Sequence, residues 1–268
     1  LGDTWKRCLY HAGPTSSKSR LHSGFYSFPQ IVTSINYVDF AENPRLSYRM
    51  SLEFSPTESQ AFPIPEVIPI FPLPSIVFFP ETYLPLHIFE PRYREMVQDA
   101  STQGRCIGMA LLKDGWEEQY YETPPIYDLG CVGRIISLHK LSDGRFNIVL
   151  QGLQRCIYTE QPTSTLYRRA KTTIRPPAPP RTLTVDIRVQ LESVAQEYLQ
   201  WRKATELSQI IHAGQLTDSI LVNNLSAGLD FTPLEKQFLL ESEDLSQQAR
   251  RLTDLLRFKL ADLPLNQE

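Results

Sequence analysis

The hydrophobic pattern of the sequence changes at a run of prolines, and this change limits the folds that the chain can adopt. Four prolines lie within residues 176–180, and consecutive prolines extend as polyproline II rather than continuing a helix or a central strand. Before this run, short apolar segments bounded by turn residues predict strands. After it, apolar residues at helical spacing predict helices. The expected fold class is therefore α+β, with strands and helices in separate regions.

The region before the proline run predicts a small, partly closed β-barrel. Asp143-Gly144 lies between two apolar runs and predicts a hairpin, because both residue types adopt positive φ with little strain. Gly152 lies between two predicted strands and indicates a bend or a bulge. The predicted strands cover residues 67–71, 76–79, 105–112, 131–139, 145–151, 153–160 and 166–174.

One short helix is expected among these strands. Pro91 suits the first helical position, where its missing N–H group would be unpaired in any case. We expect the helix to end near Gly104. Its apolar residues recur at helical spacing and form one face, which consists of Tyr93, Met96, Val97 and Ala100.

The region after the proline run predicts a bundle of four helices. Helices are expected over 187–201, 217–227 and 245–261, because apolar residues recur there every three or four positions. The best-defined helix start is Thr232-Pro233-Leu234-Glu235. Thr at the N-cap and Glu three residues later form a capping box.

These patterns divide the chain into four parts. Residues 1–62 lack periodicity and are expected to form an irregular or flexible N-terminal extension. The sequence begins with Leu1 and its first methionine is Met50, so residues 1–49 are a candidate for sequence upstream of the true start. The other parts follow in order: the barrel at 63–175, the proline-rich linker at 176–181 and the bundle at 182–268.

Charge and hydropathy argue against two classes of partner. Six basic and three acidic residues precede Met50, which leaves 21 basic and 27 acidic residues from Met50 onward. This acidic excess makes a nucleic-acid partner unfavourable. The apolar runs have no more than about five residues, and a membrane span needs ~18. We therefore expect neither nucleic acid nor membrane as a partner.

Cysteine usage is typical of a reducing compartment. The cysteines at positions 8, 106, 131 and 156 include no CxxC motif. The last three lie in strand-like stretches and are expected to be small buried hydrophobic residues. The sequence also shows no signal-peptide pattern, so we expect a cytoplasmic location.

No motif of a common enzyme class is present. The sequence lacks a phosphate-binding loop, a zinc-protease helix and a nucleophile elbow. Its five histidines are dispersed, so we expect no metal site and no cofactor. A Cys131–His139 pair would have to join residues about 26 Å apart along one strand. His87 is expected to be half-buried, with one ring nitrogen bonded to a backbone group.

Several segments together resemble one protein family. Residues 69–80 read PIFPLPSIVFFP, and residues 84–93 read LPLHIFEPRY. Together with segments 107–112, 130–135 and 143–155, they are similar to the N-terminal, substrate-binding domain of Lon protease. The resemblance extends from about Pro63 to Leu263.

This resemblance implies both a fold and a function. The implied fold is a small PUA-like β pseudo-barrel with one short helix, followed by a C-terminal helical bundle. Lon proteases continue with an ATPase module and a Ser–Lys peptidase module, for which this sequence has no counterpart. We therefore expect a stand-alone, non-catalytic module that binds unfolded or hydrophobic protein segments in protein quality control. Its expected partners are unfolded or extended polypeptides, and a protease acting in trans is a further candidate. The oligomeric state is left open.

The proline-rich segment permits two interpretations. In the first it is a scaffold, and the side chains that fill the barrel are Ile70, Phe71, Leu73, Val77 and Phe79. In the second it forms an exposed apolar groove that holds extended polypeptides. The candidate polypeptide-binding residues of this groove are Phe78, Tyr83, Leu84, Leu86, Ile88 and Phe89.

Two other functions are kept as alternatives. PUA-like barrels also occur in RNA-modifying enzymes, so a PUA-like RNA-binding module is the main alternative, by analogy of fold. A hydrolase with a dispersed active site is the third hypothesis, because catalytic residues can lie far apart in sequence.

Overall fold

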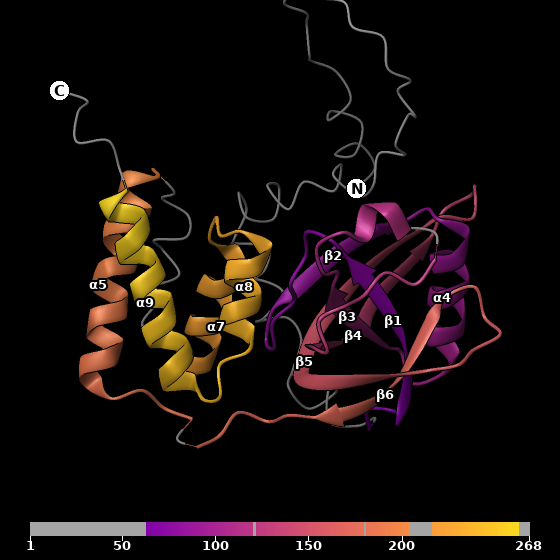
Figure 1. Cartoon of the computed structure of the whole chain (residues 1–268), viewed down its shortest axis with the longest axis horizontal. Helices are drawn as coiled ribbons and strands as arrows, with labels where there is room; N and C mark the ends of the chain where they lie inside the picture. The colour runs from indigo at the N-terminus through magenta and orange to yellow at the C-terminus, as the bar shows by residue number, and fades with distance from the viewer. Residues whose placement is uncertain (1–62, 120–121, 180, 204–215, 263–268) are drawn as a thin grey trace, which may run out of the picture. The chain divides into compact units, whose positions relative to one another are not determined.

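The computed structural model describes residues 63–119, 122–179, 181–203 and 216–262 of the 268-residue chain (Figure 1). Residues 1–62, including the predicted extension and Cys8, lie outside the described residues. The first elements are β1 (Val67–Leu73), β2 (Tyr83–Ile88), α4 (Pro91–Thr102), β3 (Cys106–Leu111), β4 (Leu129–Lys140), β5 (Phe146–Gln161) and β6 (Arg168–Ile174). The later elements are helices α5 (Val185–Trp201), α7 (Asp218–Gly228), α8 (Pro233–Leu240) and α9 (Leu245–Ala261). The predicted α+β fold class is confirmed.

The six strands found in the described part of the chain form one sheet that closes on itself. Their order is β2-β5-β4-β3-β1-β6, and β6 also pairs with β5. The pairings are antiparallel except that of β1 with β3. Closure therefore involves five strands, while β2 joins only the first part of β5, at Phe146–Gln151. The predicted pseudo-barrel is confirmed, and β2 is its added edge.

Two strand predictions need correction. Residues 76–79 form no strand; Val77 and Phe79 belong instead to an apolar cluster shared with the helices. Sequence reasoning missed β2, because Pro85 interrupts its pattern of hydrogen-bond donors. The segments 145–151 and 153–160 are one strand, β5, which bends at Gly152 as predicted.

The bend at Gly152 and the hairpin at Gly144 follow from local geometry. Gly144 has a φ of 81°, and Leu141 N–H donates to Arg145 O at 2.8 Å to close the hairpin. At Gly152, a Cβ atom would lie only 2.0 Å from the carbonyl oxygen of Phe79. No side chain fits there, so β5 can pass directly under the turn that leads into β2.

Within the described residues, the core includes two apolar clusters. The barrel cluster lies within the closed strands and includes the buried Cys106 and Cys156, which confirms their predicted role as small hydrophobic residues. The shared cluster joins Val77, Phe79, Leu111 and Leu129 to residues of α5, α7, α8 and α9. The scaffold interpretation expected Val77 and Phe79 to fill the barrel. They pack instead in the cluster that is shared with the helices.

After the proline run, the four helices of the described residues match the predicted bundle. The capping box of α8 is confirmed: Thr232 Oγ1 accepts from Glu235 N, and Glu235 Oε2 accepts from Thr232 N at 2.7 Å. α4 also matches its prediction, and its four apolar residues are buried. The end of α5 is less buried than its apolar spacing predicts, because Trp201 is 47% exposed there.

Candidate polypeptide-binding site

The six predicted site residues fall into two groups. Phe78, Leu84, Leu86 and Ile88 are buried, with 2–4% exposure. The prediction that these four side chains line an exposed groove is therefore wrong: they belong to the core. Tyr83 in β2 and Phe89 directly after it are half-buried.

Strand β2 alternates between a core face and an outer face, because successive side chains of a strand point to opposite sides. Its core face carries the buried leucines and Ile88, whereas Tyr83, Pro85 and His87 are half-buried on the outer face. The outer row was partly missed by sequence reasoning, which included Tyr83 but not Pro85. The alternation of Leu84, Leu86 and Ile88 with these residues was the available signal.

The backbone of β2 has one paired side and one edge side. Thr82 O accepts from Gly152 N at 2.8 Å, so this carbonyl points to β5. Since backbone groups alternate in direction along a strand, those of Leu84 and Leu86 also point to β5, and those of Pro85 and His87 point to the edge. Pro85 is tolerated because its missing donor falls on the edge side. Within the described residues, β2 pairs with no strand other than β5.

The outer face of β2 continues across β5 and β4. The register aligns three rows of side chains across the strands: Tyr83–Gln151–Arg134, Pro85–Val149–Ser137 and His87–Asn147–His139. Most of these side chains are half-buried or exposed, and Arg134 alone is buried. Apart from Arg134, the face combines apolar surface with polar side chains and carries no carboxylate, which suits contact with polypeptide segments of low charge.

A hydrogen-bond network fixes His87 at one end of this face. His87 Nδ1 lies 2.6 Å from Asn147 Oδ1, and His87 Nε2 lies 3.1 Å from Nη1 of Arg145. Because Arg145 can only donate and Asn147 Oδ1 can only accept, the neutral ring with its proton on Nδ1 satisfies both contacts. The expected bond from His87 to a backbone group is therefore replaced by two side-chain contacts.

The hairpin beside His87 has its own ion pair. Nη2 of Arg145 lies 2.6 Å from Oδ2 of Asp143. Hydrogen bonds from the backbone and side chain of Arg145 lower the pKa of Asp143, so this carboxyl stays ionised at neutral pH. The network thus holds the hairpin tip next to the end of β2.

A buried arginine connects β5 to the bundle. Arg155 is 5% exposed. Its guanidinium donates to the carbonyls of Leu240 at 2.9 Å, Ser242, and Glu243 at 3.4 Å, which lie at the end of α8 and in the link to α9. Positive charge at a helix C-terminus is favourable, and burial lowers the pKa of Arg155. This contact attaches the bundle to the strand that carries β2.

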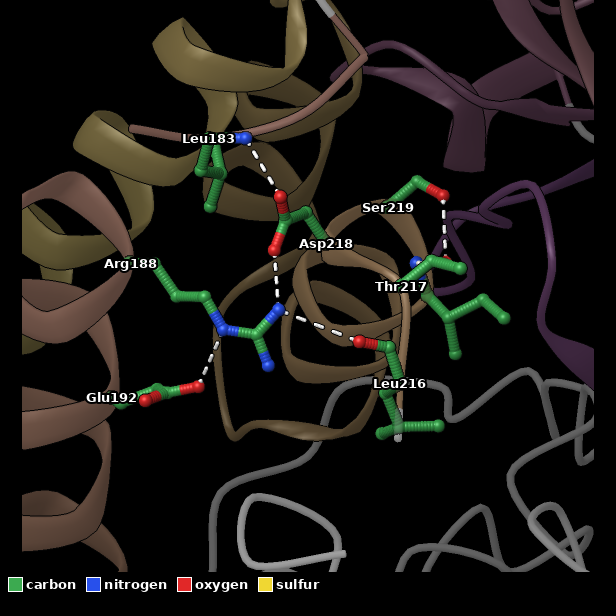
Figure 2. Close-up of polar contacts among 8 residues, drawn as sticks. Leu183, Arg188, Glu192, Leu216, Thr217, Asp218 and Ser219 are labelled. Atoms are coloured by element: carbon green, nitrogen blue, oxygen red, sulfur yellow. Dashed lines mark hydrogen bonds and ion pairs between the residues drawn. The ribbon is translucent and has the colours of Figure 1, made fainter. Parts of the chain in front are cut away.

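A second polar cluster lies within the bundle and has a structural role (Figure 2). Arg188 of α5 donates from Nε to Glu192 at 2.8 Å and from Nη1 to Asp218 at the start of α7. The other oxygen of Asp218 accepts from the backbone N–H of Leu183 at 2.7 Å. Each charged group is paired, so the cluster ties the beginnings of α5 and α7 together.

The cysteine–histidine pair considered from the sequence does not come together. Cys131 is buried in the sheet, whereas His139 is exposed near the other end of β4. Burial raises the pKa of the Cys131 thiol well above its ordinary value and that of Cys156 to about 12. These thiols stay protonated at neutral pH and are poor nucleophiles.

In residues 63–119, 122–179, 181–203 and 216–262, no group of three or more Cys, His, Asp or Glu side chains is arranged to hold a metal ion. Among the helices of those same ranges, none has the length and apolar character needed to cross a bilayer.

Comparisons with known proteins identify similar chains. Residues 67–257 match the family model of the ATP-dependent protease La (LON) substrate-binding domain. Lon protease 2 of Myxococcus xanthus is 30% identical over 211 residues, covering 76% of this chain and 25% of that protein. The Lon protease of Anaeromyxobacter dehalogenans is 29% identical over 214 residues, covering 76% and 24%. The chain thus spans about a quarter of the length of these curated relatives.

Solved structures agree at the level of the fold. The N-terminal domain of Mycobacterium avium complex Lon protease matches with a TM-score of 0.54 and 19% identity, over 71% of this chain and 98% of that one. A Lon N-terminal domain protein from Xanthomonas campestris matches with a TM-score of 0.52 and 23% identity, over 74% and 99%.

Proposed function

The chain belongs to the family of Lon protease substrate-binding domains, and on that basis we propose that it is a non-catalytic module that binds unfolded or hydrophobic segments of other proteins. The observation that carries this proposal is the edge strand β2, which pairs on one side only within the described residues and presents a half-buried outer face. An extended polypeptide can add to such an edge through backbone hydrogen bonds.

The proposed binding residues are Tyr83 and Phe89, together with Pro85 and His87 between them. Phe78, Leu84, Leu86 and Ile88 support the strand from the core side. The edge offers the Pro85 carbonyl and the N–H and carbonyl groups of His87. Because Pro85 provides no donor, an added strand forms an interrupted ladder. We therefore propose weak, transient binding that accepts many sequences.

The cellular role follows from this kind of recognition. A module that selects unfolded segments without cleaving them would act in protein quality control, either alone or by presenting clients to a protease in trans. The buried, unpaired thiols of Cys106, Cys131 and Cys156 fit the reducing cytoplasm that we propose as its location.

The RNA-binding alternative receives no comparable support. The outer face of β2, β5 and β4 contains one arginine among nine aligned positions, and that residue, Arg134, is buried. A surface that binds nucleic-acid backbone needs several exposed cations.

Binding of a permanently unfolded model protein to the full chain tests the proposal. Fluorescence anisotropy with a labelled, reduced and carboxymethylated protein would measure the dissociation constant. We expect the double variant Tyr83→Ala/Phe89→Ala to bind about tenfold more weakly, since each substitution removes apolar contact area. Val189→Ala is the matched control, because it truncates a 58% exposed apolar side chain on α5. Equal affinities for the edge variants and the control would contradict the proposed site.

A further inference from the structure

The turn that leads into β2 contains a strained residue. Glu81 has a φ of 59°, in the left-handed region that favours glycine. Its N–H group donates to Gly152 O at 2.9 Å, and Thr82 Oγ1 donates to Phe79 O at 2.7 Å. A glycine at position 81 would make the same N–H contact with less strain. What glutamate adds at this position is its side-chain contact with Asn223.

That side chain contacts the bundle, although Glu81 as a residue is exposed. Glu81 Oε2 accepts from Nδ2 of Asn223, a residue of α7 that is 7% exposed, at 3.3 Å. Asn223 Oδ1 in turn accepts from Nε2 of Gln248 in α9 at 3.1 Å. The same Gln248 nitrogen donates to Ser226 Oγ at 3.2 Å. A chain of polar contacts thus runs from α9 through α7 to the residue two positions before β2.

The direction of these hydrogen bonds is set by chemistry. An ionised carboxylate accepts and cannot donate, so Asn223 must present its amide nitrogen to Glu81 and its oxygen to Gln248. Gln248 must then present its own nitrogen. Each polar group depends on the orientation of its neighbour, so loss of Asn223 would leave both Glu81 and Gln248 without this partner.

We propose that Asn223 is a positioning residue through which the helical bundle holds the entrance of β2 and thereby sets the geometry of the edge strand. The proposal rests on the proposed function only for its effect on polypeptide affinity. The position of β2 itself can be tested without any ligand. Val77 and Phe79, which belong to the shared cluster, hold the same turn against the bundle by apolar packing. The contact between Glu81 and Asn223 then fixes the start of β2.

Amide hydrogen exchange of the full chain tests the coupling directly. We expect Asn223→Ala to accelerate exchange in the segment 82–88 about fivefold, because its opening would cost less free energy. Asn224→Ala is the matched control, since Asn224 Nδ2 bonds within α7 to Ile220 O at 2.8 Å. Unchanged exchange of β2 in Asn223→Ala relative to this control would overturn the proposal.

A second pair of variants separates coupling from general destabilisation. Glu81→Gly relieves the left-handed strain but removes the contact, whereas Glu81→Gln keeps an acceptor of the same length. We expect faster β2 exchange in Glu81→Gly without a lower melting temperature, and near-normal exchange in Glu81→Gln. This pair decides the matter if Asn223→Ala does not fold. Equal exchange in both Glu81 variants would overturn the proposal.

Polypeptide affinity is measured on the same variants. We expect Asn223→Ala to bind the carboxymethylated protein about fivefold more weakly than Asn224→Ala, because a looser edge strand must be ordered on binding. If the unmodified chain binds no polypeptide, the proposed function fails, while the exchange result still decides the coupling.

Discussion

The barrel region and the bundle use polar side chains in opposite ways. At the barrel edge, His87, Asn147 and Arg145 bond to one another on the outer face of a strand that lacks a second neighbour within the described residues. In the bundle, Asn223 and Gln248 are buried and bond to each other. The difference indicates two separate roles: the sheet provides a contact surface, and the bundle holds the strands that form this surface in position.

The largest effect is expected from removing Arg155, the arginine that joins the barrel to the bundle. Arg155→Met keeps much of the side-chain volume but leaves the carbonyls of Leu240, Ser242 and Glu243 without their charged donor. We expect a loss of about 3 kcal/mol in the free energy of unfolding, with the bundle melting before the barrel. Urea unfolding followed by far-UV circular dichroism measures this.

Arg181→Met provides the control for that experiment, because Arg181 is an exposed arginine outside the interface. Its effect should stay within about 0.5 kcal/mol. A single cooperative transition of Arg155→Met at unchanged stability would contradict the role assigned to Arg155.

A second test addresses the close approach of β5 to the turn before β2. Gly152→Ala would push a methyl group against the carbonyl of Phe79, and we expect a loss of about 2 kcal/mol. Gly115→Ala is the comparison. A Cβ atom at position 115 would meet no other atom within 4 Å, so the only cost of this substitution is the positive φ of 83°. Thermal unfolding should show the smaller loss, about 1 kcal/mol, for Gly115→Ala. The reverse order would mean that the turn does not depend on this contact.

A third test concerns the local signals that define the bundle. Thr232→Ala removes the N-cap of α8, and we expect a loss of about 1 kcal/mol. Thr232→Ser keeps the hydroxyl and should restore most of it. Chemical denaturation of the two variants side by side would refute the capping role if both behaved alike.

The smallest expected effect is a pH dependence from Lys236. Burial lowers its pKa from 10.5 to about 8 in the folded protein, although its Nζ donates to Ala227 O at 2.7 Å. Below pH 8 the folded state carries the full cost of the buried charge. As pH rises from 8 to 10.5 the folded protein releases this proton before the unfolded chain does, so stability should rise.

Lys236→Met isolates this contribution from other titrations. The unfolding free energy of the unmodified protein should gain less than about 1 kcal/mol relative to Lys236→Met between pH 8 and 10, since partial exposure reduces the effect. Unfolding titrations at several pH values check it. A difference between the two proteins that is independent of pH would exclude the assigned pKa shift.

The bundle was predictable from sequence because its signals are local. The capping box at Thr232 and the apolar spacing of α9 each act within a few residues. The exposure of Trp201 was not predictable, since its position at the end of α5 extends the same apolar stripe beyond the packed part.

The edge strand was less predictable because its environment is set by distant residues. Pro85 argues against a central strand, and only the register with β5 shows that its missing donor faces the edge. The burial of Leu84, Leu86 and Ile88, and the contact of Glu81 with Asn223, likewise depend on segments far along the chain. Resemblance to a family predicted the fold, but it could not assign these side chains to the core or the surface.

The most direct test of the account is hydrogen exchange of the full chain with and without an unfolded polypeptide. If an extended segment adds to the edge of β2, the edge-facing amide of His87 should become protected when the ligand saturates the chain. Amides in α9 should keep their exchange rates. Protection confined to the bundle, or no protection in residues 83–89 at saturating ligand, would contradict the central claim.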